Sequence, residues 1–474
     1  MRRISSVTAM VVCLSLMLGV ASSWAQRPTG NDVSDTMANT GGGTGALTNI
    51  KTGHANTAYG NLALQSNTTG TGNTAIGFDA LGSTNGNENT AVGDAALTFS
   101  NTGNNNTAVG SGALEVNFTG SNNTAVGAGA LQNNTGNDNT AVGESALLSN
   151  AGSTNTAVGS NALRLNTAGT DNIAVGANAL HGNTTGNANV AVGGAALQSN
   201  NTGGGNIAIG EDALESNTVG TNNAAVGDIA LVKNTTGANN TAFGFQTLQS
   251  NISGNFNTAM GNAALLNSTS GANNTAVGTT ALRLNTAGNE NIGLGHDAGS
   301  KLTSGNFNIY LGNRGATTES KTMRLGETQT RTFVAGIAGT PVSGSQVLVT
   351  SSGQLGILAS SARFKRGIEA IGERSAGLLQ LRPVTFRYKQ DPQGTRQYGL
   401  IAEEVAKVYP ELVTREANGA VASVQYNELI PMLLNELQRQ ERELQRLKSQ
   451  NAALGSRLAR LETAVPHSAS LASR

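Results

Sequence analysis

The 474-residue chain is poor in charged residues (12%) and in aromatic residues (4%), and it contains 62 glycines. Ordinary globular domains carry about twice that share of charged residues, so conventional globular domains are excluded for most of its length. The formal net charge is zero, and no basic excess points to nucleic acid as a partner.

The first 25 residues have the three parts of a secretory signal peptide. Two arginines precede an apolar run from about Val7 to Val20, and small residues follow up to Ala25. The run is shorter than the roughly 20 residues that span a bilayer, which favours a cleaved signal over an uncleaved anchor. We therefore expect an exported protein, at the cell surface or extracellular, with no membrane-spanning segment in the mature chain.

Cys13 lies inside this signal and is the single cysteine of the sequence. A mature chain without cysteine excludes disulfides, thiol catalysis and cysteine metal sites. Residues 26–50 are polar and rich in Gly, Thr and Asn, and we expect a flexible leader there.

A repeat of about 17 residues, occasionally 16, fills residues 51–315. Each copy reads approximately Asn-Thr-Ala-Val-Gly-x-x-Ala-Leu-x-x-Asn-Thr-x-Gly-x-Asn. Such periodicity is typical of a solenoid, in which stacked coils bury a core that no single coil could bury. The second and fourth motif positions turn apolar together, as in Ile173 and Val175, and would share one face of a short strand. We expect a parallel β-solenoid with two short strands per coil, glycine at the corners and asparagine ladders.

An array of short helices is the alternative interpretation of the Ala-Leu pairs, but helical repeats are longer and contain less glycine. The motif resembles the head repeats of trimeric autotransporter adhesins (YadA-like), which are left-handed β-rolls assembled as trimers. The period here is longer than in the commonest form of that head. The resemblance implies an adhesin-like trimer, with host or surface glycans as a candidate ligand.

The repeats offer no catalytic or metal site. His54, His181 and His296 stand singly, without partners at ligand spacing, and no pair of carboxylates for glycoside cleavage can be identified. No cofactor and no metal are expected.

Alternating segments at 332–337, 346–350 and 354–358 predict a β neck over residues 316–359. Residues 360–428 mix predicted helix and strand. These predictions are a helix at 369–381, a strand at 384–388, and a segment from Tyr398 that leads into a short helix ending at Pro410.

From about residue 429 to 463, apolar residues step alternately by three and four, which is the seam of a coiled coil. An amphipathic helix packing on its own domain is the alternative, but four uninterrupted heptads favour self-association, with Asn451 at a core position setting the register. Residues 464–474 are predicted to be a disordered tail. The seam consists of Ile430, Leu433, Leu437, Gln440, Leu444, Leu447, Asn451, Leu454, Leu458 and Leu461.

Several motifs after the repeats resemble, in order, the endosialidase-type intramolecular chaperone family, a self-cleaving serine peptidase domain. They are Ser360-Ser361-Ala362-Arg363-Phe364-Lys365, Leu381-Arg382-Pro383-Val384-Thr385-Phe386, Tyr398-Gly399-Leu400-Ile401-Ala402-Glu403-Glu404, Tyr409-Pro410-Glu411 and Tyr426-Asn427-Glu428.

The resemblance implies a Ser-Lys dyad. Ser360 would be the nucleophile, Lys365 the general base, and the bond between Ala359 and Ser360 the cleavage site. Ser361 stands where the family often has aspartate. The chain has no histidine between Asp297 and Pro466, so a Ser-His-Asp triad within this domain is impossible and lysine is the available base.

Two classes of function remain. The first is an exported homotrimeric surface fibre whose C-terminal domain drives assembly and then releases itself in a single turnover. The second is a structural or carbohydrate-binding fibre that assembles without cleavage. A glycan-degrading spike is a weaker third, since no acid pair stands out.

Overall fold

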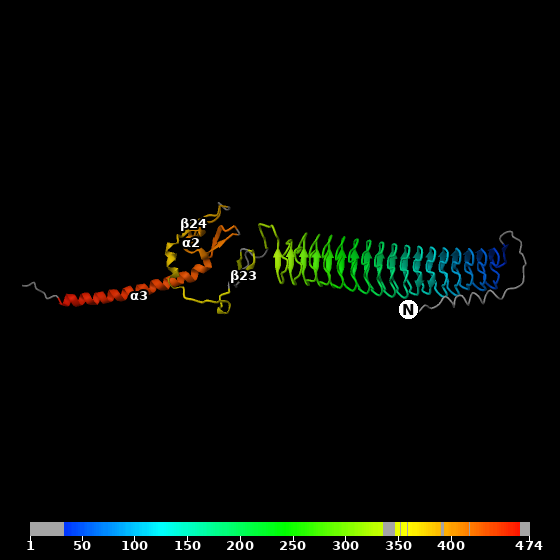
Figure 1. Ribbon diagram of the computed structural model, residues 1–474, viewed down its shortest axis with the longest axis horizontal. Helices are drawn as coiled ribbons and strands as arrows, with labels where there is room; N and C mark the ends of the chain where they lie inside the picture. The colour runs from blue at the N-terminus through cyan, green and yellow to red at the C-terminus, as the bar shows by residue number, and fades with distance from the viewer. Residues whose placement is uncertain are drawn as a thin grey trace, which may run out of the picture. The chain divides into compact units, whose positions relative to one another are not determined.

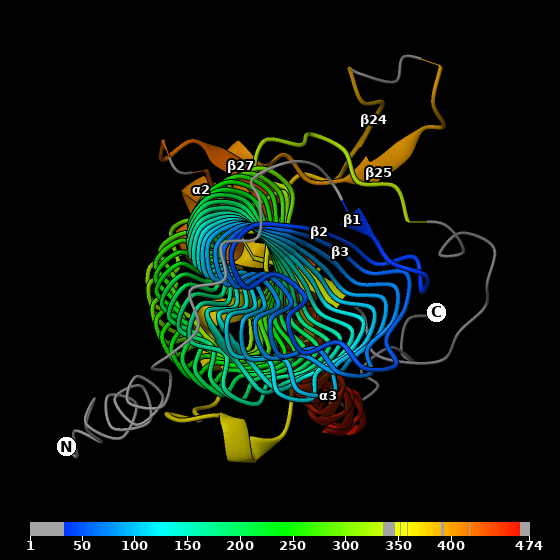
Figure 2. The ribbon, with the colours of Figure 1, turned by 90° about the vertical axis from the view of Figure 1, so that its right-hand side faces the viewer.

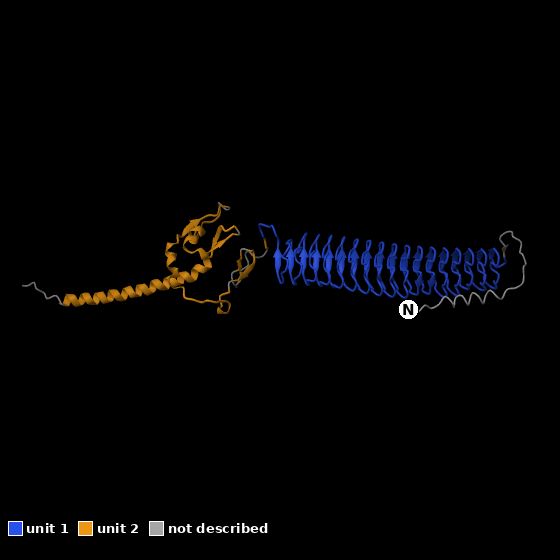
Figure 3. Cartoon of the chain, in the orientation of Figure 1, with its two compact units in different colours: residues 1–332 blue, residues 333–474 orange. Residues whose placement is uncertain are grey.

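The computed structural model describes residues 33–334, 347–350, 352–357, 359–389, 393–416 and 418–464. The chain divides into a unit of residues 1–332 and a unit of residues 333–474 (Figure 3). The predicted signal peptide lies outside the described residues, as does the predicted tail from residue 465 onward.

The first unit is a parallel β-solenoid, as the sequence predicts (Figure 1). Each coil contributes a three-residue strand that pairs in register with the equivalent strand of the next coil, and the stack is seen end-on in Figure 2. The strands of this nineteen-stranded sheet are β1 (Val33–Ser34), β2 (Thr40–Gly42), β3 (Thr57–Tyr59), β4 (Thr74–Ile76), β5 (Thr90–Val92), β6 (Thr107–Val109), β7 (Thr124–Val126), β9 (Thr140–Val142), β11 (Thr156–Val158), β12 (Ile173–Val175), β13 (Val190–Val192), β14 (Ile207–Ile209), β15 (Ala224–Val226), β16 (Thr241–Phe243), β17 (Thr258–Met260), β18 (Thr275–Val277), β19 (Ile292–Leu294), β20 (Ile309–Leu311) and β21 (Met323–Leu325).

The core of the solenoid contains small side chains. In the coil that begins at Asn172, the buried apolar residues are Ala174, Ala179 and Leu180. Ile173 and Val175 share one face of strand β12, as predicted, but that face points outward: the two residues are 43% and 37% exposed. Side chains alternate along a strand, so burying the central alanine turns both of its larger neighbours to the solvent.

Two backbone features turn the chain out of each strand. The glycine after the strand has a positive φ, 137° at Gly176, and a Cβ there would lie 2.3 Å from the carbonyl oxygen of Gly193. The buried leucine also takes a left-handed conformation, with φ of 51° at Leu180, which costs about 1–2 kcal/mol for a residue with a side chain. A hydrogen bond of 2.9 Å from the Leu180 N–H to the Ala196 oxygen of the next coil helps to hold it.

Two ladders of buried asparagine run through the stack. In the first ladder, the Asn189 side chain donates to the Asn172 side-chain oxygen at 3.1 Å and to the Gly203 carbonyl at 2.9 Å. The second ladder follows the later asparagine of each repeat, where Asn200 donates to Asn183 at 2.8 Å. Buried amides satisfied in this way fix the register of each coil on the next.

Both ends of the sheet differ from its middle. Strand β1 pairs antiparallel with β2 and covers the first edge. Near the other end, the buried Tyr310 takes the place of the central alanine, and Glu319 forms an ion pair with Arg324 at 2.7 Å beside it. Burial is the main reason that the pKa of the Tyr310 phenol is raised. A large ring fills space that alanine leaves open where the stacking ends.

The solenoid departs from the sequence prediction in its bounds and in the number of strands per coil. It begins by Thr40, inside the predicted leader of residues 26–50, and it continues past residue 315 to Leu325. Most coils have one regular strand, because the left-handed residues around the Ala-Leu pair form turns on the opposite side. Short strands on that side are β8 (Asn133–Asn134) and β10 (Ser149–Asn150).

The second unit is built of short elements and one long helix. Of the predicted neck strands, two form a hairpin, and the segment predicted at 332–337 lies largely outside the described residues. The elements are β22 (Val347–Val349), β23 (Leu355–Ile357), the 3-10 helices η1 (Ala362–Phe364), η2 (Gly372–Gln380) and η3 (Pro410–Leu412), the strands β24 (Val384–Phe386), β25 (Gln397–Gly399), β26 (Val413–Arg415) and β27 (Val421–Val424), and the helices α2 (Ala402–Val408) and α3 (Tyr426–Ala464). Among the described helices, none is long and apolar enough to cross a membrane.

We expect the buried asparagine ladder to dominate the stability of its coils. Asn257→Ala removes the oxygen that accepts from the backbone and side-chain N–H groups of Asn274, at 3.0 and 3.1 Å, and leaves the Gly271 carbonyl without its donor. Each orphaned buried group costs about 1–3 kcal/mol. Asn262→Ala is the matched control in the same coil, because Asn262 is exposed and should cost no more than about 0.5 kcal/mol. Thermal unfolding of the two variants measures the difference, and equal melting temperatures would contradict the role of the ladder.

Candidate functional site

The predicted dyad lies on an exposed segment. Every residue from Ala359 to Ala370 is solvent-exposed, and the segment contains the single turn of η1. Backbone hydrogen bonds of 3.0 Å join the Phe364 N–H to the Ser361 oxygen and the Lys365 N–H to the Ala362 oxygen. The turn thus lies between the two residues in the sequence, with Ser361 at its start, directly after Ser360, and Lys365 at its end.

The described chain does not join the two side chains. Within the described residues, no hydrogen bond or ion pair is formed by the side chain of Ser360 or Lys365. Arg363, which lies between them, stacks on the neighbouring Phe364 ring with 4.5 Å from the guanidinium carbon to the ring centroid. The single chain thus places the predicted nucleophile and base in the same short segment without the burial that a lysine base requires.

The second unit has a small apolar core of its own. Tyr409 is buried at the end of α2, and its hydroxyl donates to the Arg374 carbonyl of η2 at 2.9 Å. Burial raises the pKa of this phenol. The ring leaves so little space that a Cβ at Gly377 would lie 2.7 Å from its hydroxyl oxygen, so η2 packs closely on α2. The core consists of Val405, Tyr409, Leu412, Val413, Val424 and Leu429.

A buried polar cluster attaches the long helix α3 to η2. The Ser375 hydroxyl donates to the Glu436 carboxylate at 3.1 Å, and the Asn435 amide donates to the Ser375 hydroxyl at 2.7 Å and to the Gly372 carbonyl at 2.8 Å. Glu436 is 5% exposed and forms an ion pair with Arg439 at 3.2 Å. Burial opposes ionisation of Glu436, but the bond from Ser375 and the Arg439 ion pair outweigh it and hold the pKa of this carboxyl below its usual value.

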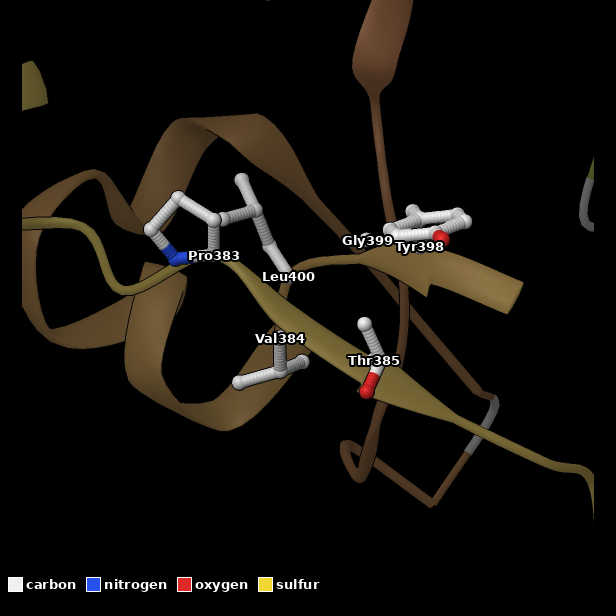
Figure 4. Close-up of a pocket in the computed structure, with 6 residues that line it drawn as sticks. All are labelled: Pro383, Val384, Thr385, Tyr398, Gly399 and Leu400. Carbon is white, nitrogen blue, oxygen red and sulfur yellow. The ribbon is translucent and has the colours of Figure 1, made fainter. Parts of the chain in front are cut away.

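A shallow hollow of about 610 Å³ lies at the β24–β25 hairpin. Figure 4 shows its lining, which consists of Val384 and Thr385 of β24 with the preceding Pro383, and Tyr398 and Gly399 of β25 with the following Leu400. Neither Ser360 nor Lys365 lines it. The lining is mostly apolar and contains no acid or base suited to neutral pH, so the hollow does not supply the missing surroundings of the dyad.

Most of helix α3 has no partner within the described chain. Every described residue from Glu441 to Thr463 is exposed, and the predicted seam includes Leu447 at 46% and Leu454 at 59% exposure. An apolar stripe along a helix is stable in water when another surface covers it. The leucine pattern therefore supports self-association rather than packing on the helix's own domain.

One protein-family model matches part of the second unit. Residues 360–414 match the model of the Peptidase_S74 family, described as the chaperone of endosialidase. The match begins at Ser360 and extends into β26. No curated protein and no solved structure matched the chain. The chain therefore combines a β-solenoid with a C-terminal segment, residues 360–414, that is similar to the chaperone of endosialidase.

The polar cluster around Glu436 was not predicted from the sequence. Glu436 lies one position before the seam residue Leu437. A charged residue at such a position is typical of the solvent-exposed face of a helix. Its partner Ser375 is 61 residues away in the sequence. No local pattern connects the two residues.

The lowered pKa of Glu436 makes the attachment of α3 sensitive to acid. A carboxylate with a depressed folded-state pKa contributes stability above its unfolded pKa, about 4.3 for glutamate, and this contribution is lost as the pH falls through the folded value. In Glu436→Gln we expect the stability of the second unit to vary less with pH below about pH 4.3. Denaturant unfolding at several pH values tests this, with the exposed Glu462→Gln as control. A slope unchanged from that of the parent protein in Glu436→Gln would refute the coupling.

Proposed function

We propose that this protein is an exported homotrimeric surface fibre, adhesin-like in its repeats, whose C-terminal domain directs assembly of the solenoid. The observation that carries the proposal is the family match at residues 360–414, which is followed in the chain, after strand β27, by a helix with an uncovered leucine seam. A repetitive solenoid offers nearly equal energies for neighbouring registers, so an assembly domain that holds the chains together serves a physical need.

The exposed neck supports the same proposal. In the hairpin β22–β23, Val347, Val349, Leu355 and Ile357 are all more than 60% exposed. An isolated two-stranded hairpin is marginally stable at best in water. Copies of the chain brought together by α3 would cover these residues, which lie between the solenoid and the chaperone domain in the sequence.

We further propose that the domain cleaves the chain before Ser360. The Ser360 hydroxyl attacks the carbonyl carbon of Ala359 as Lys365 takes the hydroxyl proton, and the peptide C–N bond breaks as that proton passes to the leaving nitrogen. Water then hydrolyses the resulting ester, leaving the Ala359 carboxylate and free Ser360. A lysine in water is protonated at neutral pH and acts as a base when burial favours its neutral form. Lys365 is exposed in the single chain, so cleavage would follow the assembly that covers it.

The alternative is a structural fibre that assembles without cleavage. It is favoured by the serine at position 361 and by the exposure of both Ser360 and Lys365, whose side chains form no hydrogen bond with each other in the described chain. The two proposals predict different mature chains, one ending at Ala359 and the other retaining the second unit.

Intact mass and denaturing gels of the purified protein test cleavage. We expect the parent chain to appear as two fragments that meet at Ala359 and Ser360, and Ser360→Ala to stay whole. Lys365→Arg should also stay whole, because arginine keeps the charge but cannot act as a base. Ser361→Ala is the control and should cleave as the parent does. An uncut parent that is trimeric in solution would leave assembly as the sole role of the domain.

The helix seam is tested by paired substitutions in α3. Leu454→Lys places a charge in the seam and should convert the trimer to monomers, because a buried unpaired charge costs several kcal/mol. Ala453→Lys adds the same charge one residue away, outside the seam, and should leave the trimer intact. Light scattering coupled to size-exclusion chromatography measures both masses. A trimeric Leu454→Lys protein would show that α3 does not hold the chains together.

A further inference from the structure

Two consecutive coils of the solenoid are one residue shorter than the coils on either side of them. In the short coils, Asn134 and Asn150 of the second asparagine ladder each donate to the carbonyl of a glycine two residues further on, at 2.8 Å. In the coils before and after, the equivalent glycine lies three residues beyond Asn117 and Asn166. The missing residue belongs to the turn side of the coil, where β8 and β10 lie. The shortening therefore removes backbone at two adjacent levels of that side.

A notch of about 280 Å³ lies where these residues are missing. Phe118 lines the notch from the coil before and is 53% exposed, and Thr167 lines it from the coil after. Apart from Val116 and Ala151, the rest of the lining is polar, and no charged side chain of the described residues belongs to it. Pockets for small ligands measure about 300–1,000 Å³, so the notch suits one small unit of a ligand.

The base of the notch is fixed, and its rim carries free polar groups. Asn134 and Asn150 form the base, where they are buried, and the Asn150 amide donates to the Asn134 side-chain oxygen at 2.9 Å. Pairing of β8 with β10 sets Asn133 beside Ser149. Within the described chain, the side chains of Asn133, Thr135 and Ser149 form no hydrogen bond. Their amide and hydroxyl groups are therefore available to a ligand.

Two backbone donors beside the notch also have no partner. After the notch, the N–H groups of Thr167 and Ala168 both donate to the Thr184 oxygen of the next coil, at 3.0 and 2.9 Å. The N–H groups of Phe118 and Thr119 hold the equivalent places, but no residue of the described chain accepts a hydrogen bond from them. They face the first shortened coil, whose turn is one residue too short to bring a carbonyl to them.

A shortened coil nearer the N-terminus satisfies the equivalent donors by itself. There the Asn85 side-chain oxygen accepts from the Thr68 N–H at 3.0 Å and from the Thr69 N–H at 3.4 Å. Thr135 holds the position of Asn85 in the first coil of the notch, and its side chain forms no such bond within the described chain. The notch thus keeps free the donors that an asparagine would satisfy.

We propose that this notch binds one neutral sugar unit of a glycan. A pyranose has a face of C–H groups that packs on an aromatic ring such as Phe118, and its hydroxyl groups both donate and accept hydrogen bonds. The lining has no Lys or Arg to pair with an anion, and a wholly apolar ligand would leave the polar rim unpaired. The whole lining comes from one chain, so the inference goes beyond the proposed assembly and does not depend on it.

Saturation-transfer NMR tests the site in the purified protein. The probes are the methyl pyranosides of glucose, galactose, mannose and N-acetylglucosamine, with N-acetylneuraminic acid as the charged comparison. We expect transfer to at least one of the four neutral probes. Phe118→Ala should weaken the binding of that probe by about tenfold, because the ring contact is lost. Phe78→Ala is the matched control, because Phe78 is 54% exposed and lies outside the notch, and it should bind as the parent does.

Thr135→Asn tests the two free backbone donors. The new amide oxygen should accept from the N–H groups of Phe118 and Thr119, as Asn85 does in its own coil, and it should lower the affinity for the probe without lowering the melting temperature. Thr218→Asn is the control, because Thr218 follows the ladder asparagine of a full-length coil away from the notch. It should leave the affinity unchanged.

The contrary results are distinct. Transfer to none of the four neutral probes, or stronger binding of N-acetylneuraminic acid than of all four, would overturn the proposal. Equal affinities of Phe118→Ala and the parent would show that the sugar binds elsewhere. A native mass that falls in Phe118→Ala but not in Phe78→Ala would show that a second copy of the chain occupies the notch in place of a sugar.

Discussion

The solenoid depends on one repeated contact, the bonding of each coil to the same positions of the next. A coil with two buried alanines and one buried leucine has no core of its own, and its asparagines and backbone groups find their partners in neighbouring coils. Stability is then close to a sum of nearest-neighbour terms. The same contact compensates for left-handed leucines such as Leu180, whose conformation would be unfavourable in an isolated turn.

The narrow interior of the coils has a second consequence. In most strands the central alanine is buried, and the larger side chains on either side of it face the solvent. The single chain therefore presents apolar residues on the sheet face, on both strands of the neck hairpin, and along α3. These surfaces belong to different parts of the sequence and use different geometry. The proposed assembly of several copies of the chain would cover the neck hairpin and α3, and it is consistent with the match to the chaperone of endosialidase at residues 360–414.

The period of the repeat was sufficient to predict a parallel solenoid, since a 17-residue motif with glycine corners admits few other structures. The period did not show which face of the strand is buried. Alternation defines two faces, but it does not say whether the face with Ala174 or the face with Val175 is turned to the core. The ordered series of motifs from Ser360 onward predicted a similarity to the endosialidase chaperone, and the family model matches residues 360–414. The Ser375–Glu436 contact joins distant residues, and no spacing in the sequence could reveal it.

In-register stacking at 16 or 17 residues per coil, up to the last coil, also bears on how such a gene can change. Each coil meets its neighbours through near-identical surfaces, as β12, β13 and β14 illustrate. Duplication or loss of one repeat unit in the coding sequence would lengthen or shorten the stack by one rung and leave every remaining contact intact. A change in the number of repeats by recombination would therefore give a chain that still folds, because each added or lost coil brings or removes a complete set of contacts.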